Sequence, residues 1–287
     1  MPCDCHIHMI LDGVYYRSAI DHQKDAPDEQ LIRSRLASYA AHGVTFLRDG
    51  GDAWGVGLAA ARLAGEYGID YRSPAFPIYS RGHYGSFIGR GFEDMKAYRA
   101  LVAQAEAMGA DFIKIMISGL MDFDHYGVIT GAPYREEIIT EMIRIAHGEG
   151  FSVMAHANGA NTLRVAAEAG VDSIEHGAYP DDAALRAMAD HHVIWTPTLS
   201  TIGNLIGCGR YRDDVLAPLL ETQSQALRDF AAMGGLIACG SDAGAYLVPH
   251  VQGASDEYRY LARALGANAD ELLGRGNAEI QRRFKRH

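Results

Sequence analysis

The sequence is poor in three features, each of which would define a class of protein. Its 287 residues include four cysteines, too few for a disulfide scaffold and typical of the reducing cytoplasm. No run approaches the ~20 apolar residues of a membrane span, and the first residues lack the pattern of a secretory signal. Lysine and arginine number 26 against 36 acidic residues, a net charge of -10, so a basic face for nucleic acid is not expected. We expect a cytoplasmic protein that binds neither membrane nor nucleic acid.

What the sequence does contain is a regular alternation of short apolar runs and longer amphipathic segments. The short runs are rich in β-branched and aromatic residues, as in buried parallel strands, and occupy residues 3–9, 44–49, 71–79, 112–118, 151–156, 171–176, 193–199 and 236–242. Helical patterns occupy residues 28–42, 54–67, 93–108, 134–149, 159–169, 181–190, 212–233 and 255–285. Several of these end in glycine, which readily takes the left-handed conformation that closes a helix. Eight strand–helix units predict an α/β fold, a (β/α)8 barrel in which residues 1–287 form a single domain.

Two histidines of the first run are expected on the same face of its strand. Side chains alternate between the two faces of a strand, so His6 and His8 point the same way, with Asp4 below them. Two imidazoles at this spacing can bind one metal ion. The pattern is also common by chance, and its meaning depends on the rest of the chain.

Other runs carry further potential metal ligands at the same end of the expected barrel. Lys114 lies within an apolar run, where a charged amine is costly unless its charge is neutralised or paired. Reaction with carbon dioxide would convert this amine into a carbamate, whose oxygens can bind hard cations. His156, His176 and Asp242 close three other runs, and active sites of barrel enzymes lie at the carboxyl ends of the strands. Together with His6 and His8, these residues predict a site for two divalent metal ions.

These residues resemble, in type and order, the amidohydrolase superfamily and its branch of prolidase-like and imidazolonepropionase-like metal-dependent hydrolases. The resemblance covers essentially the whole chain and rests on Asp4-x-His6-x-His8, Phe112-Ile113-Lys114-Ile115, Met154-Ala155-His156-Ala157, Ile174-Glu175-His176-Gly177 and Gly240-Ser241-Asp242-Ala243-Gly244. It implies that His6, His8 and Asp242 bind the more buried of two metal ions. It further implies that His156 and His176 bind the second ion and that carbamylated (carboxylated) Lys114 bridges both. The usual metal of the family is zinc, Zn2+.

The same resemblance implies an activity. A hydroxide activated by the binuclear centre would hydrolyse a C–N bond (amide, peptide or cyclic amide) of a small molecule such as a dipeptide or N-acyl amino acid. Asp242 would carry the proton to the leaving group. His83 matches the family's histidine that contacts the substrate or its scissile carbonyl, and is expected to be catalytic. The further expected substrate contacts are Tyr84, Arg81, Tyr126 and His250, with Arg81 suited to a substrate carboxylate.

Other functions remain open on the sequence alone. The same hydroxide could hydrolyse a lactone or an ester, a related barrel could act as a metal-dependent decarboxylase or isomerase, and a barrel could bind metal without turnover. Lys114 argues against the decarboxylase or isomerase, since those relatives commonly use one metal without a bridging carbamate. The intact ligand set with Asp242 argues against a non-catalytic barrel.

Relatives in this branch also carry a small accessory β-sandwich. The few residues before His6 and the 45 after Asp242 leave no room for it, so we expect the barrel alone. Because the bottom or flank of the barrel would then be uncovered, we expect a homo-oligomer in which a partner subunit covers it.

Overall fold

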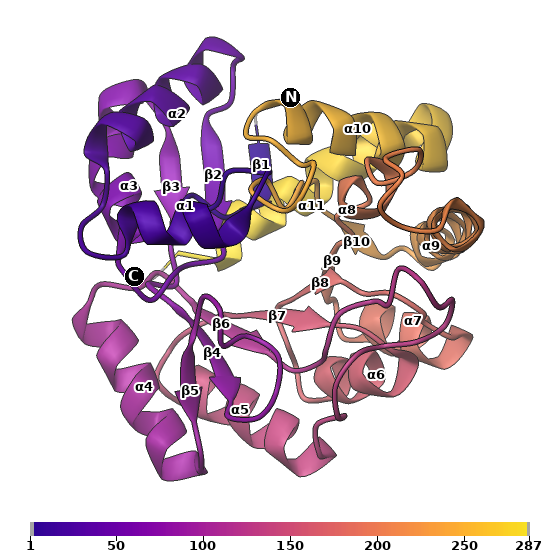
Figure 1. The fold of residues 1–287 in the computed structure, drawn as a ribbon. Helices are drawn as coiled ribbons and strands as arrows, with labels where there is room; N and C mark the ends of the chain where they lie inside the picture. The colour runs from indigo at the N-terminus through magenta and orange to yellow at the C-terminus, as the bar shows by residue number, and fades with distance from the viewer. Residues whose placement is uncertain (1–2, 286–287) are drawn as a thin grey trace.

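A computed structural model describes residues 3–285. Its strands are β1 (Cys3–Ile7), β2 (Phe46–Asp49), β3 (Asp70–Arg72), β4 (Pro77–Ser80), β5 (Arg90–Phe92), β6 (Ile113–Met116), β7 (Val153–Ala157), β8 (Ser173–His176), β9 (Ile194–Thr196) and β10 (Leu236–Ile237). Its helices are α1 (Tyr16–Gln23), α2 (Glu29–Ala41), α3 (Val56–Ala64), α4 (Met95–Ala107), α5 (Glu136–Gly148), α6 (Ala160–Glu168), α7 (Asp182–Asp190), α8 (Ser200–Gly203), α9 (Asp213–Ala232), α10 (Gln252–Leu265) and α11 (Ala269–Arg283). Single 3-10 turns lie at η1 (Gly65–Tyr67) and η2 (Gly266–Asn268). The helices surround the strands (Figure 1).

The strands are all parallel and form two ladders, β1-β2-β3 and β10-β9-β8-β7-β6-β4-β5. The ladders meet at two seams. Residues 73–76 interrupt the third strand of the barrel, so that β3 pairs with β2 while β4 pairs with β6. At the other seam the Cys5 amide donates to the Cys239 carbonyl (2.8 Å) and the Asp242 amide to the His6 carbonyl (2.7 Å). The predicted (β/α)8 barrel is confirmed.

The interruption of the third strand has a local cause. Pro74 lacks the amide proton that a strand ladder requires, and the Asp111 amide instead donates to the Ser73 carbonyl at 2.8 Å. Strand β10 is also shorter than its apolar run predicts, because it ends at Ile237, although the Ala238 amide still donates to the Trp195 carbonyl at 2.9 Å. Strand β5 and helices α1 and α8 were not expected from the sequence.

Aspartates begin three of the helices that follow the barrel strands. The side chains of Asp28, Asp94 and Asp181 accept hydrogen bonds from the first-turn amides of α2, α4 and α7, respectively. This satisfies amide groups that have no partner within the helix. The starts of these helices are therefore set by local hydrogen bonds as well as by packing.

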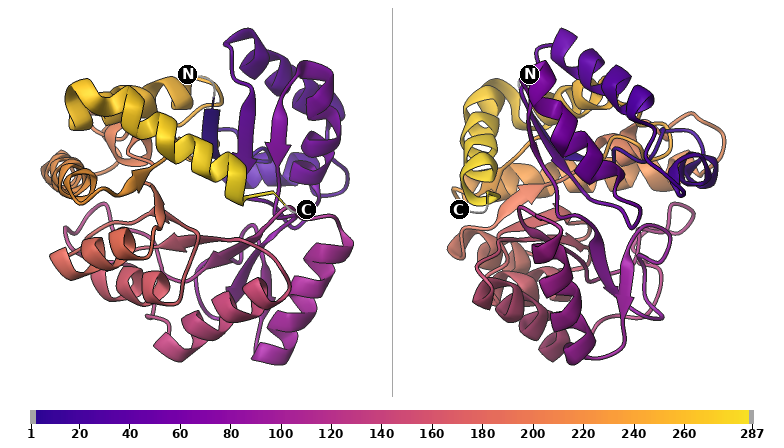
Figure 2. Two further views of the ribbon diagram at one scale, coloured as in Figure 1. Left: turned by 180° about the vertical axis from the view of Figure 1, so that it is seen from behind. Right: turned by 90° about the vertical axis from the view of Figure 1, so that its left-hand side faces the viewer.

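The lower part of the barrel interior is an apolar plug. It is formed by the inward-facing residues near the amino ends of four strands, Phe46, Phe112, Met154 and Ile194, together with Phe284 after α11. The Phe284 ring meets the Phe112 ring edge-on, with centroids 5.3 Å apart, and α11 runs across this end of the barrel (Figure 2). Helix α11 therefore covers the bottom of the barrel, and the expected homo-oligomer stays a prediction.

No helix within residues 3–285 is long and apolar enough to cross a membrane.

Candidate metal centre

Four imidazoles converge above the apolar plug, at the carboxyl ends of three strands. His6 lies on β1 with His8 just beyond its end, His156 lies on β7, and His176 closes β8. The ring centroids of His6 lie 5.3 Å from His8 and 5.4 Å from His176, and those of His156 and His176 lie 4.6 Å apart. All four residues are at least nine-tenths buried. The four predicted histidines therefore form one cluster.

Asp242 approaches this cluster from the segment after β10. Its Oδ1 lies 3.3 Å from His8 Nε2 and 3.6 Å from His6 Nε2. One potential ligand atom from each of His6, His8 and Asp242 lies within 4.8 Å of the other two, close enough to hold one ion. This is a donor set of the kind that divalent transition metals prefer.

Lys114 reaches the same interior from β6. Its side chain is 1% exposed, and its Nζ has no hydrogen-bond partner among the described residues. Burial lowers the pKa of the Lys114 amine, with Glu175 opposing that shift. A buried, unpartnered amine with a lowered pKa is suited to reaction with carbon dioxide, because the neutral amine is the nucleophile.

The protonation of the histidines also fits metal binding. Burial, reinforced by the nearby Lys114 charge, lowers the pKa of His8 and of His156 to about 3. Burial likewise holds the pKa of His6 and His176 well below the usual value. Buried His6 Nε2 and His8 Nδ1 have no hydrogen-bond partner within residues 3–285. Neutral rings with unused nitrogens are the form in which histidine binds metals, so these residues fit a resident cation.

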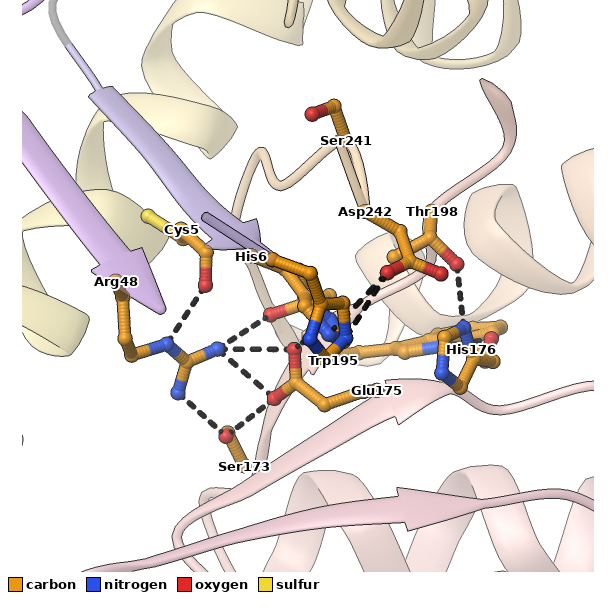
Figure 3. A network of polar contacts seen from close by, with 12 residues as sticks. Cys5, His6, Arg48, Ser173, Glu175, His176, Trp195, Thr198, Ser241 and Asp242 are labelled. Atoms are coloured by element: carbon orange, nitrogen blue, oxygen red, sulfur yellow. Dashed lines mark hydrogen bonds and ion pairs between the residues drawn. The ribbon is translucent and has the colours of Figure 1, made fainter. Parts of the chain in front are cut away.

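A buried ion pair fixes the orientation of His6 (Figure 3). His6 Nδ1 lies 2.9 Å from Glu175 Oε2, and its Nε2 lies 3.6 Å from Asp242 Oδ1. Arg48 Nη2 donates to both Glu175 oxygens, at 2.8 and 3.0 Å, and Ser173 Oγ donates to Oε1 at 2.6 Å. Arg48 and Glu175 are both fully buried. Glu175 therefore acts as a positioning residue for His6, and Arg48 neutralises its charge.

Arg48 is itself held on three sides. Its Nε donates to the Cys5 carbonyl at 2.7 Å and its Nη1 to Ser173 Oγ at 2.8 Å. Its guanidinium carbon lies 4.4 Å from the centre of the Phe284 ring, in a cation–π contact. The ion pair thus lies between the histidine cluster, through His6, and the apolar plug, through Phe284.

The backbone at the rim of the site adopts an unusual conformation. His176, Thr198 and Asp242 all have positive φ, of 67°, 50° and 59°. Such residues persist only where their surroundings hold them, and they gather at functional sites. Trp195 Nε1 and Gln223 Nε2 both donate to the His176 carbonyl, and His176 Nδ1 lies 2.7 Å from Thr198 Oγ1. The turn at His176 breaks the strand alternation, so that the side chains of neighbouring Glu175 and His176 both point into the barrel interior.

A cavity of about 390 Å³ opens above the cluster, within the range typical of small-molecule sites. His8, His156, His176 and Asp242 form its polar base. Its walls are largely apolar and aromatic and include Leu11, Val14, Tyr15, Tyr16, Tyr84, Phe87, Leu120, Met121, Phe123, Leu205, Tyr211 and Tyr246. A small apolar molecule with a polar reacting group fits such a cavity.

Of the predicted substrate contacts, Tyr84 alone is among the residues that line this cavity. Its ring packs on that of His156, with centroids 4.9 Å apart. His83 turns away, because its ring packs on Tyr134 (4.2 Å) and its Nδ1 lies 3.2 Å from the Ala132 carbonyl. His83 therefore does not line the cavity.

The other three predicted contacts also have partners elsewhere. Arg81 is mostly exposed and pairs with Glu93 at 3.4 Å. The Tyr126 hydroxyl lies 2.8 Å from Thr222 Oγ1. His250 bridges the Tyr39 hydroxyl (3.0 Å) and the Leu11 carbonyl (2.9 Å). None of these three side chains lines the cavity.

Sequence reasoning missed Arg48, Glu175 and Arg210, the last of which lies at the cavity wall. Arg48 and Glu175 each interrupt an apolar strand run, as Lys114 does, and a buried charge requires a partner. That signal could have revealed the ion pair. Arg210 lies in a loop, and nothing in the sequence indicates the direction of its side chain.

Asp49 gives a pH-dependent stability that can be measured on the metal-free protein. Burial, with Asp52 adding to it, raises the pKa of Asp49 from 3.8 to about 7. The folded protein therefore holds this proton more tightly than the unfolded chain. The resulting stabilisation is complete below pH 3.8 and is lost as the pH rises through about 7. Between pH 5 and pH 8, we expect the free energy of unfolding of wild type, measured in urea, to fall by about 3 kcal/mol relative to that of Asp49→Asn. Parallel stability curves would contradict this assignment.

The fold and site together define a class: a (β/α)8 barrel with a histidine, lysine and aspartate group at the carboxyl ends of its strands. The sequence model of the amidohydrolase family matches residues 20–274, and the chain belongs to this family. Uncharacterized proteins of Mycobacterium tuberculosis and Mycobacterium bovis are 28% identical to it over 196 residues, or 63% of this chain. The chain spans about half (49%) of the length of these curated relatives.

Solved structures share the fold over nearly the whole chain. A Xaa-Pro dipeptidase superposes with a TM-score of 0.79 at 21% identity, covering 98% of this chain and 74% of that one. The ochratoxinase of A. niger gives 0.78 at 20% identity, covering 97% and 70%. A prolidase crystallised with N-methylphosphonate-L-proline gives 0.70 at 23% identity, covering 98% and 71%. The predicted resemblance to prolidase-like amidohydrolases is confirmed.

Proposed function

We propose that this chain is a metal-dependent hydrolase that cleaves an amide C–N bond of a small molecule. The observation that carries the proposal is the cluster of four neutral histidines, Lys114 and Asp242 at the base of an apolar cavity. Membership of the amidohydrolase family supports it. So do the named activities of the structural neighbours, which include dipeptidase, prolidase and ochratoxinase.

The candidate ligands would form two groups. His6, His8 and Asp242 would hold one divalent ion, His156 and His176 a second, and Lys114, as its carbamate, would bridge the two. Zn2+ suits the imidazole-rich set best. Such ions, when bound, lower the pKa of water toward about 7 and polarise a carbonyl.

The chain's own residues then provide proton transfer and positioning. Asp242 accepts a proton on its carboxylate from the attacking water, whose oxygen bonds to the carbonyl carbon of the amide. Asp242 passes this proton to the amide nitrogen as the C–N bond breaks, so that the products are a carboxylic acid and an amine. Tyr84, packed on His156, contacts the substrate beside the reacting carbonyl.

The carbamate on Lys114 predicts a distinct spectroscopic signature. In protein prepared with ¹³C-labelled bicarbonate, wild type should show a carbamate carbon resonance that Lys114→Met lacks. Turnover of the variant should fall by at least about 100-fold, since a bridging ligand is lost. Lys96→Met, which alters an exposed lysine on α4, is the matched control and should keep both signal and rate. A resonance that survives in Lys114→Met, or is missing from wild type, would contradict the carbamate.

A hydrolysis screen tests the reaction itself. Metal-loaded protein should release amine from dipeptides or N-acyl amino acids, and the rate should depend on added metal. Lactones belong in the same screen, because an activated water attacks C–O bonds as readily. Turnover of lactones without any turnover of amides would overturn the assignment to C–N bonds.

A further inference from the structure

The walls of the cavity carry one cationic side chain. Among the residues that the structure describes, Arg210 is the only lysine or arginine that lines it, and Asp242 at its base is the only carboxylate. Arg210 lies in the loop between α8 and α9, on the same wall as Tyr211 and Tyr246. Outside the metal centre, the charge of the cavity is therefore positive.

The Arg210 guanidinium has aromatic neighbours and, within residues 3–285, no carboxylate partner. Its central carbon lies 4.6 Å from the Tyr246 ring centre and 5.2 Å from that of Tyr211. Nearby Arg212, by contrast, pairs with Asp214 at 2.5 Å. Stacking on two rings orients the planar guanidinium and leaves its N–H groups for an incoming anion, which they bind in bidentate fashion.

The other residues of the wall favour a substrate with a large apolar group. Six aromatic side chains besides Tyr84 face the cavity, namely Tyr15, Tyr16, Phe87, Phe123, Tyr211 and Tyr246. Burying a large apolar group against them is favourable by roughly 25 cal/mol per Å². A cationic substrate would meet Arg210 with no acidic side chain on the walls to offset the repulsion.

We propose that Arg210 binds the carboxylate of an anionic amide whose other large group is aromatic or apolar, such as an N-acyl aromatic amino acid. This assignment rests on the proposed hydrolase function and names the substrate class for the same site. It moves carboxylate recognition from Arg81 to Arg210.

Two substrates that share the scissile bond and differ in the charge of one group test whether Arg210 recognises that charge. Wild type should hydrolyse N-acetyl-L-phenylalanine with a kcat/KM about 10- to 100-fold above that of its uncharged carboxamide. Arg210→Met should abolish this preference by slowing the acid alone, and Arg212→Met should leave it unchanged. N-acetylglycine should be poorer than N-acetyl-L-phenylalanine by about 10- to 100-fold, because the aromatic contact is lost. Equal losses for acid and carboxamide in Arg210→Met would overturn the role.

Calorimetry measures binding without turnover and so tests the Arg210 site separately from the hydrolase function. The two ligands are small, and neither has an amide that joins two large groups. Metal-loaded wild type should bind 3-phenylpropanoate at least about tenfold more tightly than 3-phenylpropanamide, and Arg210→Met should bind the two alike. A preference that persists in Arg210→Met would place the carboxylate on the metal centre and overturn the proposal. An Arg210-dependent preference without turnover of either acetyl substrate would support the binding site and refute the hydrolase function.

Discussion

Asp242→Asn is expected to lower kcat by about 10²- to 10⁴-fold, the range that general acid–base groups contribute. The substitution retains an oxygen near His6 and His8 but cannot accept and return a proton at that position. Metal content should stay close to that of wild type, so that the loss lies in the chemical step. The measurement is kcat together with bound metal on the same preparation.

Asp25→Asn, on an exposed part of the chain, is a suitable control and should keep the wild-type rate. If Asp242→Asn also keeps a near-wild-type rate, Asp242 does not move the proton. If it loses all metal, its main role is ligation.

Arg48→Met is expected to destabilise the protein by about 3–5 kcal/mol, because it leaves the buried Glu175 carboxylate without its cation. In a chain of this size, this corresponds to a fall in Tm of about 10 °C. Thermal unfolding of metal-free protein measures the effect without interference from bound ions.

Arg144→Met removes an exposed ion pair with Glu141 and should change stability by less than about 1 kcal/mol. Replacing Arg48 and Glu175 together by methionine should recover part of the loss, since no unpaired charge remains. An Arg48→Met variant as stable as Arg144→Met would show that the ion pair does not support the barrel.

The order of strands and helices could be predicted because each buried strand is an apolar run and each outer helix an amphipathic one. The inward direction of His6 and His8 follows from strand alternation in the same way. Alternation fails at His176, where positive φ lets Glu175 and His176 both serve the interior. The alternation of side chains along a strand could not by itself predict that turn.

Loop side chains were beyond prediction for a different reason. His83 and Tyr84 are neighbours after β4, and only packing against Tyr134 and His156, far along the chain, decides which of them faces the cavity. Arg210 was missed likewise, because its direction depends on Tyr246 in another loop. Sequence can therefore place the clustered histidines, lysine and aspartate, which lie at strand ends, more reliably than the loop side chains that line the cavity.

We propose that the histidine, lysine and aspartate cluster holds a binuclear metal centre. Elemental analysis of protein reconstituted with Zn2+ and freed of excess metal tests it most directly. The arrangement predicts about two ions per chain in wild type and about one or fewer in Lys114→Met. Less than one ion per chain under metal-replete conditions, with Lys114→Met indistinguishable from wild type, would contradict it.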